Sequence, residues 1–592
     1  MFFGWPGTTL DTREKAEADS RTARDTYEIH HRAMTEASKS GAGRIGMTAP
    51  LRNPLYRNIW LASLLSNHAL MIQGVGAAWA MTELTTNASM VALVQTATTL
   101  PILLLALPAG AIADMYDRRG VSIVALLLSI TGVSILFGLA LTGHISAWAL
   151  LAFSFLIGSG TAIFWPTWQS SVSDYVPVEL LPSAVALNSI SFNVARSFGP
   201  AVGGVIVATA GAVAAFGTGL LLYFPMLAVL FNSKRMVEPA RLPPERLSRA
   251  VISGIRYVFH SPPIRVVIVR AFVLGLMGGS VLALLPLISR DLLGGDAKTF
   301  GFQLGSFGMG AVVGAFNVAR VRKHFGFEGA LRSSVAVMAF AVAIAAISRN
   351  ELLTAVCIFF TGVGWMLSTT TFNVAIQISV PRWVAGRSIA SFQASLSGGI
   401  ALGSWGWGVL AEATSVETAL LVSAGGIFAG GVLGLWMRVA DAAKTYAEEA
   451  EVPPDPEVKL ALTSRSGPIV IELEYRVPAQ EARAFYRLML EVQLSRQRNG
   501  AYGWSLARDV GDPELWIERY HCPTWLDFLR QRSRPTQAER LLHQQAMAYH
   551  RGDEPLRVRR MLERPFGSVR WKEEARDRGA TDVLPLSPQG GT

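Results

Sequence analysis

Charged residues gather in a short segment between two long uncharged runs. The runs 97–113 and 121–142 carry no charge, whereas Asp114, Arg118 and Arg119 lie in the few residues between them. A carboxylate near a helix terminus can couple to the helix dipole, and arginines in a short loop set the side of a membrane on which the loop lies. The segment therefore indicates a charged turn between two membrane helices, which could serve only to determine topology.

Arg196 and His68 are ionisable side chains inside apolar runs that are long enough to cross a bilayer. A charge at the bilayer centre costs about 2.5–3.5 kcal/mol on insertion scales, so such a residue should face a cavity or a partner. Arg196 could line a central cavity and hold an anionic or phenolate-bearing substrate, or it could pair with Asp174 or Glu179. The ordinary histidine pKa of about 6.5 suits proton coupling, so His68 could carry that role or could be a satisfied packing residue.

Neutral amide side chains recur within the same runs. Some should line a path for a substrate, while others should be interhelical hydrogen-bond partners worth about 0.6 kcal/mol each. The sequence leaves both roles open for Gln95, Gln169, Asn193, Asn373, Gln377 and Gln393. No Asp or Glu falls in the core of a predicted span, and no phosphate-binding loop or metal-spaced cluster is present. We therefore expect no catalytic residue, no cofactor and no metal.

The composition is that of a membrane protein. Of 592 residues, 51% are hydrophobic and 16% are charged, against about 25% charged in soluble domains. The mean hydropathy is +0.35, although residues 1–54 and 440–592 are as polar as a soluble protein. We predict an all-α polytopic membrane protein with twelve transmembrane helices in two six-helix pseudo-repeats, followed by a small α+β domain. The predicted spans are 57–80, 88–112, 121–142, 147–169, 183–208, 211–232, 264–289, 299–320, 330–347, 351–377, 387–412 and 416–437.

Basic residues in the short loops predict the topology. One side receives Arg118, Arg119 and the basic central linker, while opposite loops such as 83–88 and 411–417 carry almost no positive charge. Both termini should therefore be cytoplasmic, in a chain that crosses the inner (plasma) membrane many times. These loops and a basic tail account for the net charge of +10, so the lipid bilayer is the expected partner and nucleic acid is not.

Changes in composition divide the chain into six parts. They are a partly disordered N-terminal extension (1–54), a six-helix bundle (55–232), a cytoplasmic linker (233–263), a second six-helix bundle (264–438), an α+β domain (460–565) and a disordered tail (566–592). The linker is rich in proline, and 247–259 has the periodicity of an amphipathic helix at the membrane surface.

The charged segment also follows a known spacing. Gly110, Asp114, Arg118 and Arg119 fit the pattern G-x-x-x-D-x-x-G-R-R/K, with Asp117 in place of the second glycine. This pattern resembles the loop between helices 2 and 3 of the major facilitator superfamily. The resemblance implies that the loop acts as a conformational latch between the two halves on the cytoplasmic side.

A second resemblance covers the predicted fifth helix. Residues 176–189 and 193–204 look like the branch that contains enterobactin-exporter-like permeases. The second stretch includes a motif similar to one associated with antiporters, formed by Gly199, Pro200, Gly203 and Gly204. Glycine lets helices approach closely and proline permits a kink, so we expect a packing and hinge element rather than a ligand site.

The C-terminal region is predicted to be a separate domain. Expected strands at 468–477, 502–509 and 515–520 are interleaved with expected helices at 480–498 and 533–550. This order resembles the ferredoxin-like fold of small monooxygenase-type domains, a likeness that does not carry function. It indicates a regulatory or dimerising module, through which the chain could self-associate.

Together these features predict a secondary active transporter for a small-molecule substrate. The expected activity is export of amphiphilic, siderophore- or drug-like molecules by alternating access with proton coupling. Two other classes stay open, namely a membrane-tethered enzyme whose α+β domain acts on a small aromatic substrate, and a ligand sensor in which that domain senses the ligand and the membrane part signals.

Overall fold

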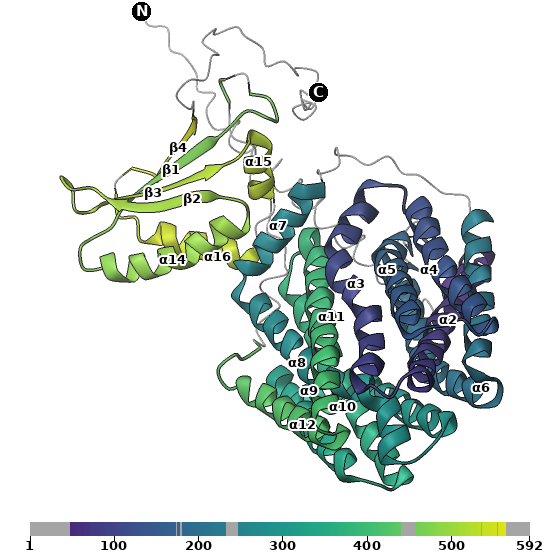
Figure 1. Ribbon diagram of the computed structural model, residues 1–592. Coiled ribbons are helices and arrows are strands. Elements are labelled where there is room, and N and C mark those ends of the chain that lie inside the picture. The colour runs from purple at the N-terminus through teal and green to yellow at the C-terminus, as the bar shows by residue number, and fades with distance from the viewer. Residues whose placement is uncertain are drawn as a thin grey trace, which may run out of the picture.

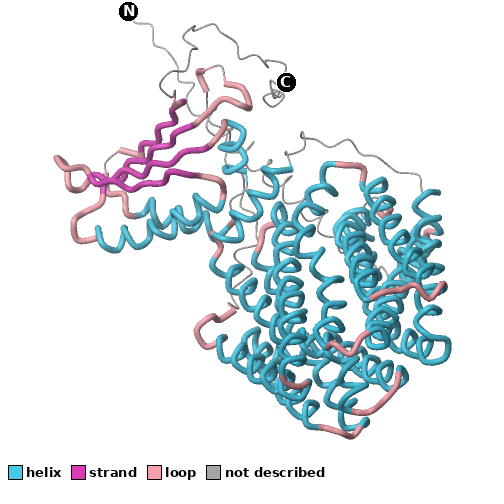
Figure 2. The backbone as a smooth tube through the Cα atoms, viewed as in Figure 1, coloured by secondary structure: helices cyan, strands magenta, loops and turns pink. Residues whose placement is uncertain are grey.

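The computed structural model describes residues 48–172, 175–177, 180–232, 247–439, 458–460, 462–533, 536–552 and 554–563. They form a helical body and a small sheet domain at one end of it (Figure 1). All the strands belong to the sheet domain (Figure 2). We call the side of the body that bears the sheet domain and α7 (Leu247–Phe259) the proximal side, and the opposite side the distal side.

The helical body has one part before α7 and one part after it. The first half contains η1 (Ala49–Arg52), α2 (Pro54–Leu84), α3 (Ala88–Met115), α4 (Arg118–Leu141), α5 (Ala147–Ser171) and α6 (Leu181–Asn232). The second half contains α8 (Pro262–Leu287), the π-helical turn η4 (Ile288–Leu292), α9 (Ala297–Ile347), α10 (Glu351–Ser379), α11 (Arg382–Ala413) and α12 (Val416–Leu433).

Polar side chains begin several of these helices, because the first backbone N–H groups of a helix have no partner within it. Asn53 Oδ1 accepts a hydrogen bond from the Leu55 N–H at 2.9 Å, and this bond begins α2. Asn350 Oδ1 accepts one from the Leu353 N–H at 2.9 Å, and this bond begins α10. The asparagines thus fix where two long apolar segments become helical.

A single glycine reverses the chain inside α6. Gly211 has φ +76°, a conformation that glycine adopts without a Cβ clash. Gly203 before the turn lies against Ile72 of α2, and Gly219 after the turn lies against Gln73 of the same helix. The two arms of α6 therefore run back along one stretch of α2.

Eight helices in the described part of the chain are long and apolar enough to cross a membrane. Two of them, Ile190–Asn232 and Ala297–Ile347, have 43 and 51 residues, about twice the length that a bilayer needs. The sequence predicted breaks near 209–210 and 321–329, and the backbone is non-helical at Gly211 in α6 and at Gly326 (φ +68°) in α9. Each of these two long elements is therefore a pair of helical arms joined by a turn, and the number of twelve spans stays a prediction.

The sheet domain contains β1 (Ile469–Arg476), α14 (Ala482–Arg498), β2 (Tyr502–Arg508), β3 (Leu515–Cys522), α15 (Trp525–Ser533), α16 (Gln537–Ala548) and β4 (Arg557–Leu562). The strands form an antiparallel sheet in the order β2-β3-β1-β4. Three strands and two helices agree with the sequence prediction, while α15 and the arginine-rich β4 were not expected.

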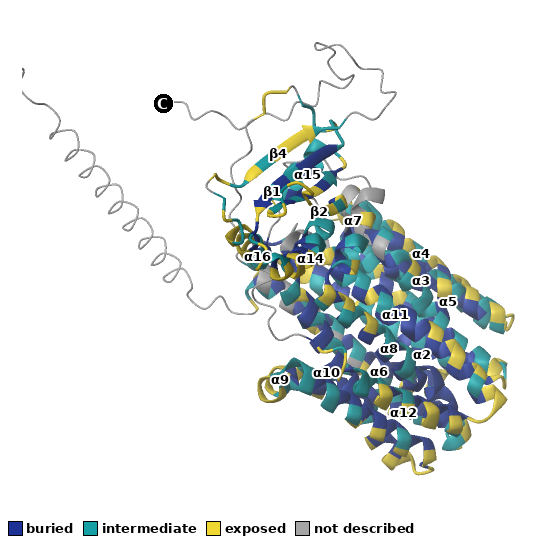
Figure 3. Ribbon diagram, turned by 90° about the vertical axis from the view of Figure 1, so that its left-hand side faces the viewer, coloured by how far each residue is buried: buried dark blue, intermediate teal, exposed yellow. Residues whose placement is uncertain are grey.

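The helical body and the sheet domain each have a core of their own. In the sheet domain, Phe485 and Met489 of α14 bury against Ile471 and Tyr475 of β1. In the helical body, buried residues lie between the helices, and the surface carries many exposed apolar side chains (Figure 3). Exposed apolar surface of this extent is expected where lipid is the solvent.

Candidate functional site

The charged loop between α3 and α4 fastens the last helix of its own half. Arg119 donates from Nε to the Leu230 carbonyl and from Nη2 to the Phe231 carbonyl, both at 2.7 Å. These carbonyls belong to the C-terminal end of α6, where a cation also complements the helix dipole. Asp117 caps α4, since its Oδ2 accepts from the Gly120 N–H at 2.9 Å.

The rest of the predicted latch lies on either side of Asp117. Gly110 and Asp114 belong to the last turns of α3, where the structure describes only the backbone. Arg118 begins α4 and is half-buried. The contacts of Arg119 lie within the first half, and a role between the two halves stays a prediction.

The second half has a stronger counterpart of this contact. Arg270 of α8 is 4% exposed and lies 2.6 Å from the carboxylate of Glu328, which follows the Gly326 bend in α9. Arg332, one turn further along α9, lies 2.9 Å from the other oxygen of the same carboxylate. One half-buried acid therefore holds two arginines, and the group joins α8 to α9.

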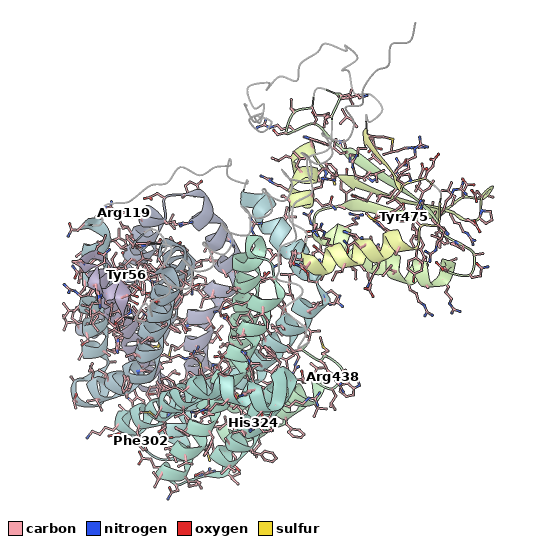
Figure 4. The ribbon with its side chains drawn as sticks, turned by 180° about the vertical axis from the view of Figure 1, so that it is seen from behind. Tyr56, Arg119, Phe302, His324, Arg438 and Tyr475 are labelled. Atoms are coloured by element: carbon pink, nitrogen blue, oxygen red, sulfur yellow. The ribbon has the colours of Figure 1, made fainter. Side chains whose placement is uncertain are left out.

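The Arg270–Glu328–Arg332 group also holds the chain that leaves α12. Arg332 Nη2 donates to the Gly434 carbonyl at 2.9 Å, and Arg270 Nη1 donates to the Met437 carbonyl at 3.1 Å. In each half, then, an arginine near the start of a helix holds the end of the last helix. Arg119 lies in one half, and His324, beside the Gly326 bend of α9, and Arg438, after the end of α12, lie far from it in the other half (Figure 4).

Sequence reasoning missed this group although a signal was present. Arg270 is a charge inside the predicted span 264–289, and such a residue is a candidate for a functional role. Glu328 was assigned to a loop because the helix was expected to stop at residue 320. In the structure Glu328 belongs to α9, two residues after the Gly326 turn.

The glycines of the predicted fifth-helix motif form close helix contacts. A methyl group on Gly199 would lie 2.6 Å from Met71 Cβ, and one on Gly203 would lie 3.1 Å from Ile72 Cα. Gly199, Pro200, Gly203 and Gly204 are all buried. Only small residues fit at such approaches between helices.

Gly204 lies between the two halves. It faces Gly301 of α9, where a methyl group would lie 2.6 Å from Gly204 Cα. One turn closer to the proximal side, a methyl group on Gly305 would lie 3.2 Å from Ala201 Cβ. Both contacts lie near the distal ends of α6 before its turn and of α9 at its start.

A second line of contacts between the halves runs along α3 and α11. At the distal end, the Ser89 N–H donates to Glu412 Oε2 at 3.3 Å. Further inward, Thr96 Oγ1 donates to the Ala401 carbonyl at 2.8 Å. A methyl group on Gly398 would lie 2.9 Å from Leu103, about halfway along both helices. The two helices are therefore packed together from their distal ends to their middles.

Arg290 adds a polar contact at the distal end. It lies in the π-helical turn after α8, beside Asp291 at 2.6 Å. Its Nη1 donates to the Thr82 carbonyl at 3.1 Å and to the Thr85 carbonyl at 3.4 Å, at the C-terminal end of α2 in the other half. Nearby, Trp79 stacks on Phe300 with ring centres 5.9 Å apart, again across the two halves.

The predicted amide residues lie on several helices and do not converge on one point. Gln169 of α5, Gln377 of α10 and Gln393 of α11 are exposed near the proximal ends of their helices. Gln377 Nε2 donates to Asn373 Oδ1 one turn away. Gln95 is half-buried in α3. Asn193 lies in α6, and the structure describes only the backbone of this residue.

The two ionisable candidates have different surroundings. His68 Nδ1 is 2.8 Å from the Leu64 carbonyl of its own helix, and the ring approaches Gly199 of α6. Arg196 is half-buried in α6, and no hydrogen bond or ion pair of its guanidinium is formed with the described residues. The acids with which it was expected to pair, Asp174 and Glu179, lie outside the described residues.

The sheet domain contains a buried polar group of its own. Glu518 is fully buried and accepts from Tyr475 Oη at 3.2 Å, Arg496 Nε at 3.0 Å and Trp504 Nε1 at 3.1 Å. Burial lowers the pKa of Arg496, but Glu518 and the neighbouring tyrosines outweigh it, so the pKa is raised. Both oxygens of this acid accept hydrogen bonds within the domain, which is the arrangement of a structural core. Among the described residues, no three His, Cys, Asp or Glu side chains could hold a metal ion.

Comparison with known proteins identifies the whole arrangement. The family described as "Transmembrane secretion effector" matches residues 45–566, a range that includes the helical body and the sheet domain. The staphyloferrin A transporter of Staphylococcus aureus is 24% identical over 53% of this chain and 79% of its own length. The multidrug efflux pump Tap of Mycolicibacterium fortuitum is 25% identical over 58% and 85%, and the enterobactin exporter EntS of Shigella boydii is 24% identical over 65% and 92%.

Solved structures show the same fold in the helical body. The nucleoside transporter NupG matches with a TM-score of 0.51 and 10% identity, over 65% of this chain and 98% of its own. A bacterial homologue of the human lysosomal transporter Spinster, in an inward-facing and unoccupied conformation, matches with a TM-score of 0.52 and 13% identity, over 66% and 95%. The chain therefore belongs to the transmembrane secretion effector family of the major facilitator superfamily, and it is a multi-pass membrane transporter rather than an enzyme.

Proposed function

We propose that this protein exports small amphiphilic molecules, of siderophore or drug type, by alternating access with proton coupling. The observation that carries the proposal is the position of the contacts between the halves. The contacts of α3 with α11 and of α6 with α9 lie in the distal parts of these helices. A seal between the two halves at one end is what a transporter with its site between repeats requires. The efflux activities named for two of the relatives support the direction.

The proposal includes twelve membrane spans in two six-helix units. The eight apolar helices become ten spans when the turns at Gly211 and Gly326 divide α6 and α9. The helices α2 and α11, with 31 and 32 residues, supply the other two, although they are more polar. The domain boundaries at 55–232 and 264–438 follow from this division.

We propose that the proximal side faces the cytoplasm of a bacterial inner membrane. Arg118 and Arg119 lie there, and so do Arg320, Arg322 and Lys323 at the end of the first arm of α9. Basic residues favour the cytoplasmic side of short loops. The closed distal side then faces outward, and the structure corresponds to an inward-facing state.

Arg196 is the proposed contact for an acidic group of the substrate. It lies in the arm of α6 whose distal end meets the second half through Gly204. A charged residue in a span is costly unless it faces water, a partner or a substrate. His68 is the proposed coupling residue, because one ring nitrogen is held by the Leu64 carbonyl and the ring lies beside α6.

The sheet domain is proposed to have the ferredoxin-like fold. The strand order β2-β3-β1-β4 and the helices between β1 and β2 and between β3 and β4 support this assignment. Self-association through this domain stays a prediction.

Metabolite profiling of cells and medium tests the export proposal. Strains would express the full chain, Arg196→Met, the matched control Arg57→Met at an exposed proximal position, or no transporter. We expect a compound to accumulate in the medium with the full chain and with Arg57→Met, and to fall at least about tenfold with Arg196→Met, because a charge-assisted contact is worth about 1.5–3 kcal/mol. Identical profiles in all strains, with each protein folded in the membrane, would refute export.

A further inference from the structure

The helix α7 connects the sheet domain to the helical body. It lies between them in both ribbon views (Figures 1 and 3). On one side α7 contacts α3, α8 and α11, and on the other it contacts α14 of the sheet domain. Its apolar residues Ile252 and Phe259 are exposed, seven positions apart on one helix face, as suits a helix at a membrane surface.

The contact between α7 and the sheet domain is built around Tyr257. This side chain is 4% exposed, and the Arg498 guanidinium lies 5.9 Å from the centre of its ring. Arg498 is itself fixed, because its Nη2 lies 3.0 Å from Glu539 of α16. A desolvated guanidinium over a tyrosine ring is an attractive contact. The sheet domain therefore holds the positive charge of Arg498 in place over the ring of Tyr257.

Gly500 of the sheet domain lies next to this contact and touches the neighbouring residue of α7. Gly500 has φ +109°, and a methyl group there would lie 2.9 Å from Arg256 Nη2 of α7. The turn that follows α14 therefore lies directly against the guanidinium end of Arg256, and its positive φ favours glycine. The sheet domain thus meets two adjacent residues of α7, Arg256 and Tyr257.

The helix α7 also lies on the proximal end of α11. Gly254 is buried, and a methyl group on it would lie 2.9 Å from Arg387 Cβ. The helices α3 and α11, which α7 contacts here, are the same two that are packed together from Ser89 and Glu412 to Leu103 and Gly398. The helix α7 therefore lies against the proximal ends of a pair that is sealed at its distal ends.

We propose that the sheet domain is an intramolecular regulator that stabilises the proximal-open state by holding α7 in place. For the proximal side to close, the proximal ends of α3 and α11 must approach each other, and α7 must shift. A sheet domain bound to α7 through Tyr257 and Gly500 opposes that shift. A ligand or partner that loosens this contact would release the transporter toward the opposite state. The inference rests on the proposed alternating access but needs no substrate for its test.

The test measures the distance between the two halves at the distal side in the full chain. Spin labels are placed at the exposed loop residues His144 and Thr414, one in each half, and the protein is reconstituted in lipid nanodiscs. Both native cysteines, Cys357 and Cys522, are buried, which limits background labelling. Tyr257→Ala removes the ring beneath Arg498, and Tyr257→Phe keeps it as the matched control.

We expect Tyr257→Ala to raise the distal-open fraction about fivefold, the factor for loss of one partly buried cation–π contact, while Tyr257→Phe, which keeps the ring and loses the hydroxyl beside Ser261, raises it less. Hydrogen exchange of residues 247–259 reports separately whether docking has loosened. Faster exchange with an unchanged distance distribution would overturn the coupling. If Tyr257→Ala leaves exchange unchanged, Arg498→Ala is measured, and unchanged exchange there too would overturn the docking account. A failure of export in the metabolite assay leaves this result intact, so the two proposals are distinguished.

Discussion

Replacing Glu328 by glutamine tests the buried charge group of the second half most directly. The carboxylate lies 2.6 Å from Arg270 and 2.9 Å from Arg332, and the three side chains are 15%, 3% and 35% exposed. Glu328→Gln keeps the shape of the side chain but removes the negative charge. Arg270 then keeps a full charge in a place that water scarcely reaches.

The expected loss of stability in Glu328→Gln comes mainly from the burial of Arg270, and not only from the attraction between Arg270 and Glu328. At an effective dielectric constant of about 20, unit charges 2.6 Å apart attract by about 6 kcal/mol, and desolvation offsets most of this. Removing one partner of a buried pair leaves the desolvation cost of the other, about 3–5 kcal/mol. Arg332 is more exposed and contributes less. We therefore expect Glu328→Gln to destabilise the body by about 3 kcal/mol or more.

Thermal unfolding of the purified full chain, followed by tryptophan fluorescence, measures the effect. Glu351→Gln is the matched control, because Glu351 is exposed in the first turn of α10, where its charge is worth at most about 1 kcal/mol. The double variant Arg270→Met/Glu328→Gln should recover part of the lost stability, since it removes the stranded charge. Equal melting temperatures for Glu328→Gln and Glu351→Gln, or no recovery in the double variant, would refute the reasoning.

Three further predictions concern the distal contacts and the sheet domain. The added side chain of Gly204→Val should overlap Gly301 and destabilise the distal-closed state by about 1–3 kcal/mol. The distance between the distal spin labels should then become longer. The control Gly138→Val places its side chain in open space and should not change that distance. Arg290→Gln should also increase the distal-open fraction, several-fold by the same measurement, because it weakens a charge-assisted bond to the Thr82 carbonyl; no change would show that the bond does not restrain the halves. Burial, together with Arg496 and Arg498, lowers the pKa of His543 well below its ordinary value of about 6.5, so the unfolded state binds more protons below that pH. The stability of the sheet domain to unfolding should therefore fall as the pH drops below about 6.5, and His543→Leu should flatten this dependence; a flat profile in the wild type would contradict it.

The sequence predicted most of the helical elements because their signal is local. Apolar runs of membrane length gave the positions of α4, α5 and α10 to within a few residues. The sequence predicted a loop where the structure has a one-residue turn at Gly326. The basic residues around this glycine are as polar as the residues of an ordinary loop. The strand β4 was missed because its arginines hide the alternation of Val558 and Leu562, which face the core.

The contacts of the candidate site could not be read from the sequence in the same way. Arg119 was chosen for its spacing, yet its partners are backbone carbonyls 111 and 112 positions away, which carry no sequence signal. The pairing of Gly204 with Gly301 depends on how two halves meet, and many other glycines in the chain look the same. Glu328 was misplaced for a simpler reason, since its burial depends on α8 and on the chain after α12.

The two one-residue turns limit where the chain can be cut or extended. Gly211 and Gly326 combine φ of +76° and +68° with ψ near 180°, a region that only glycine occupies without strain of about 1–3 kcal/mol. Because each turn consists of a single glycine, neither has loop residues that could accommodate an inserted epitope, a protease site or a fluorescent fusion. The exposed segment 142–144 is a place where a topology reporter can be added without disturbing helix pairing.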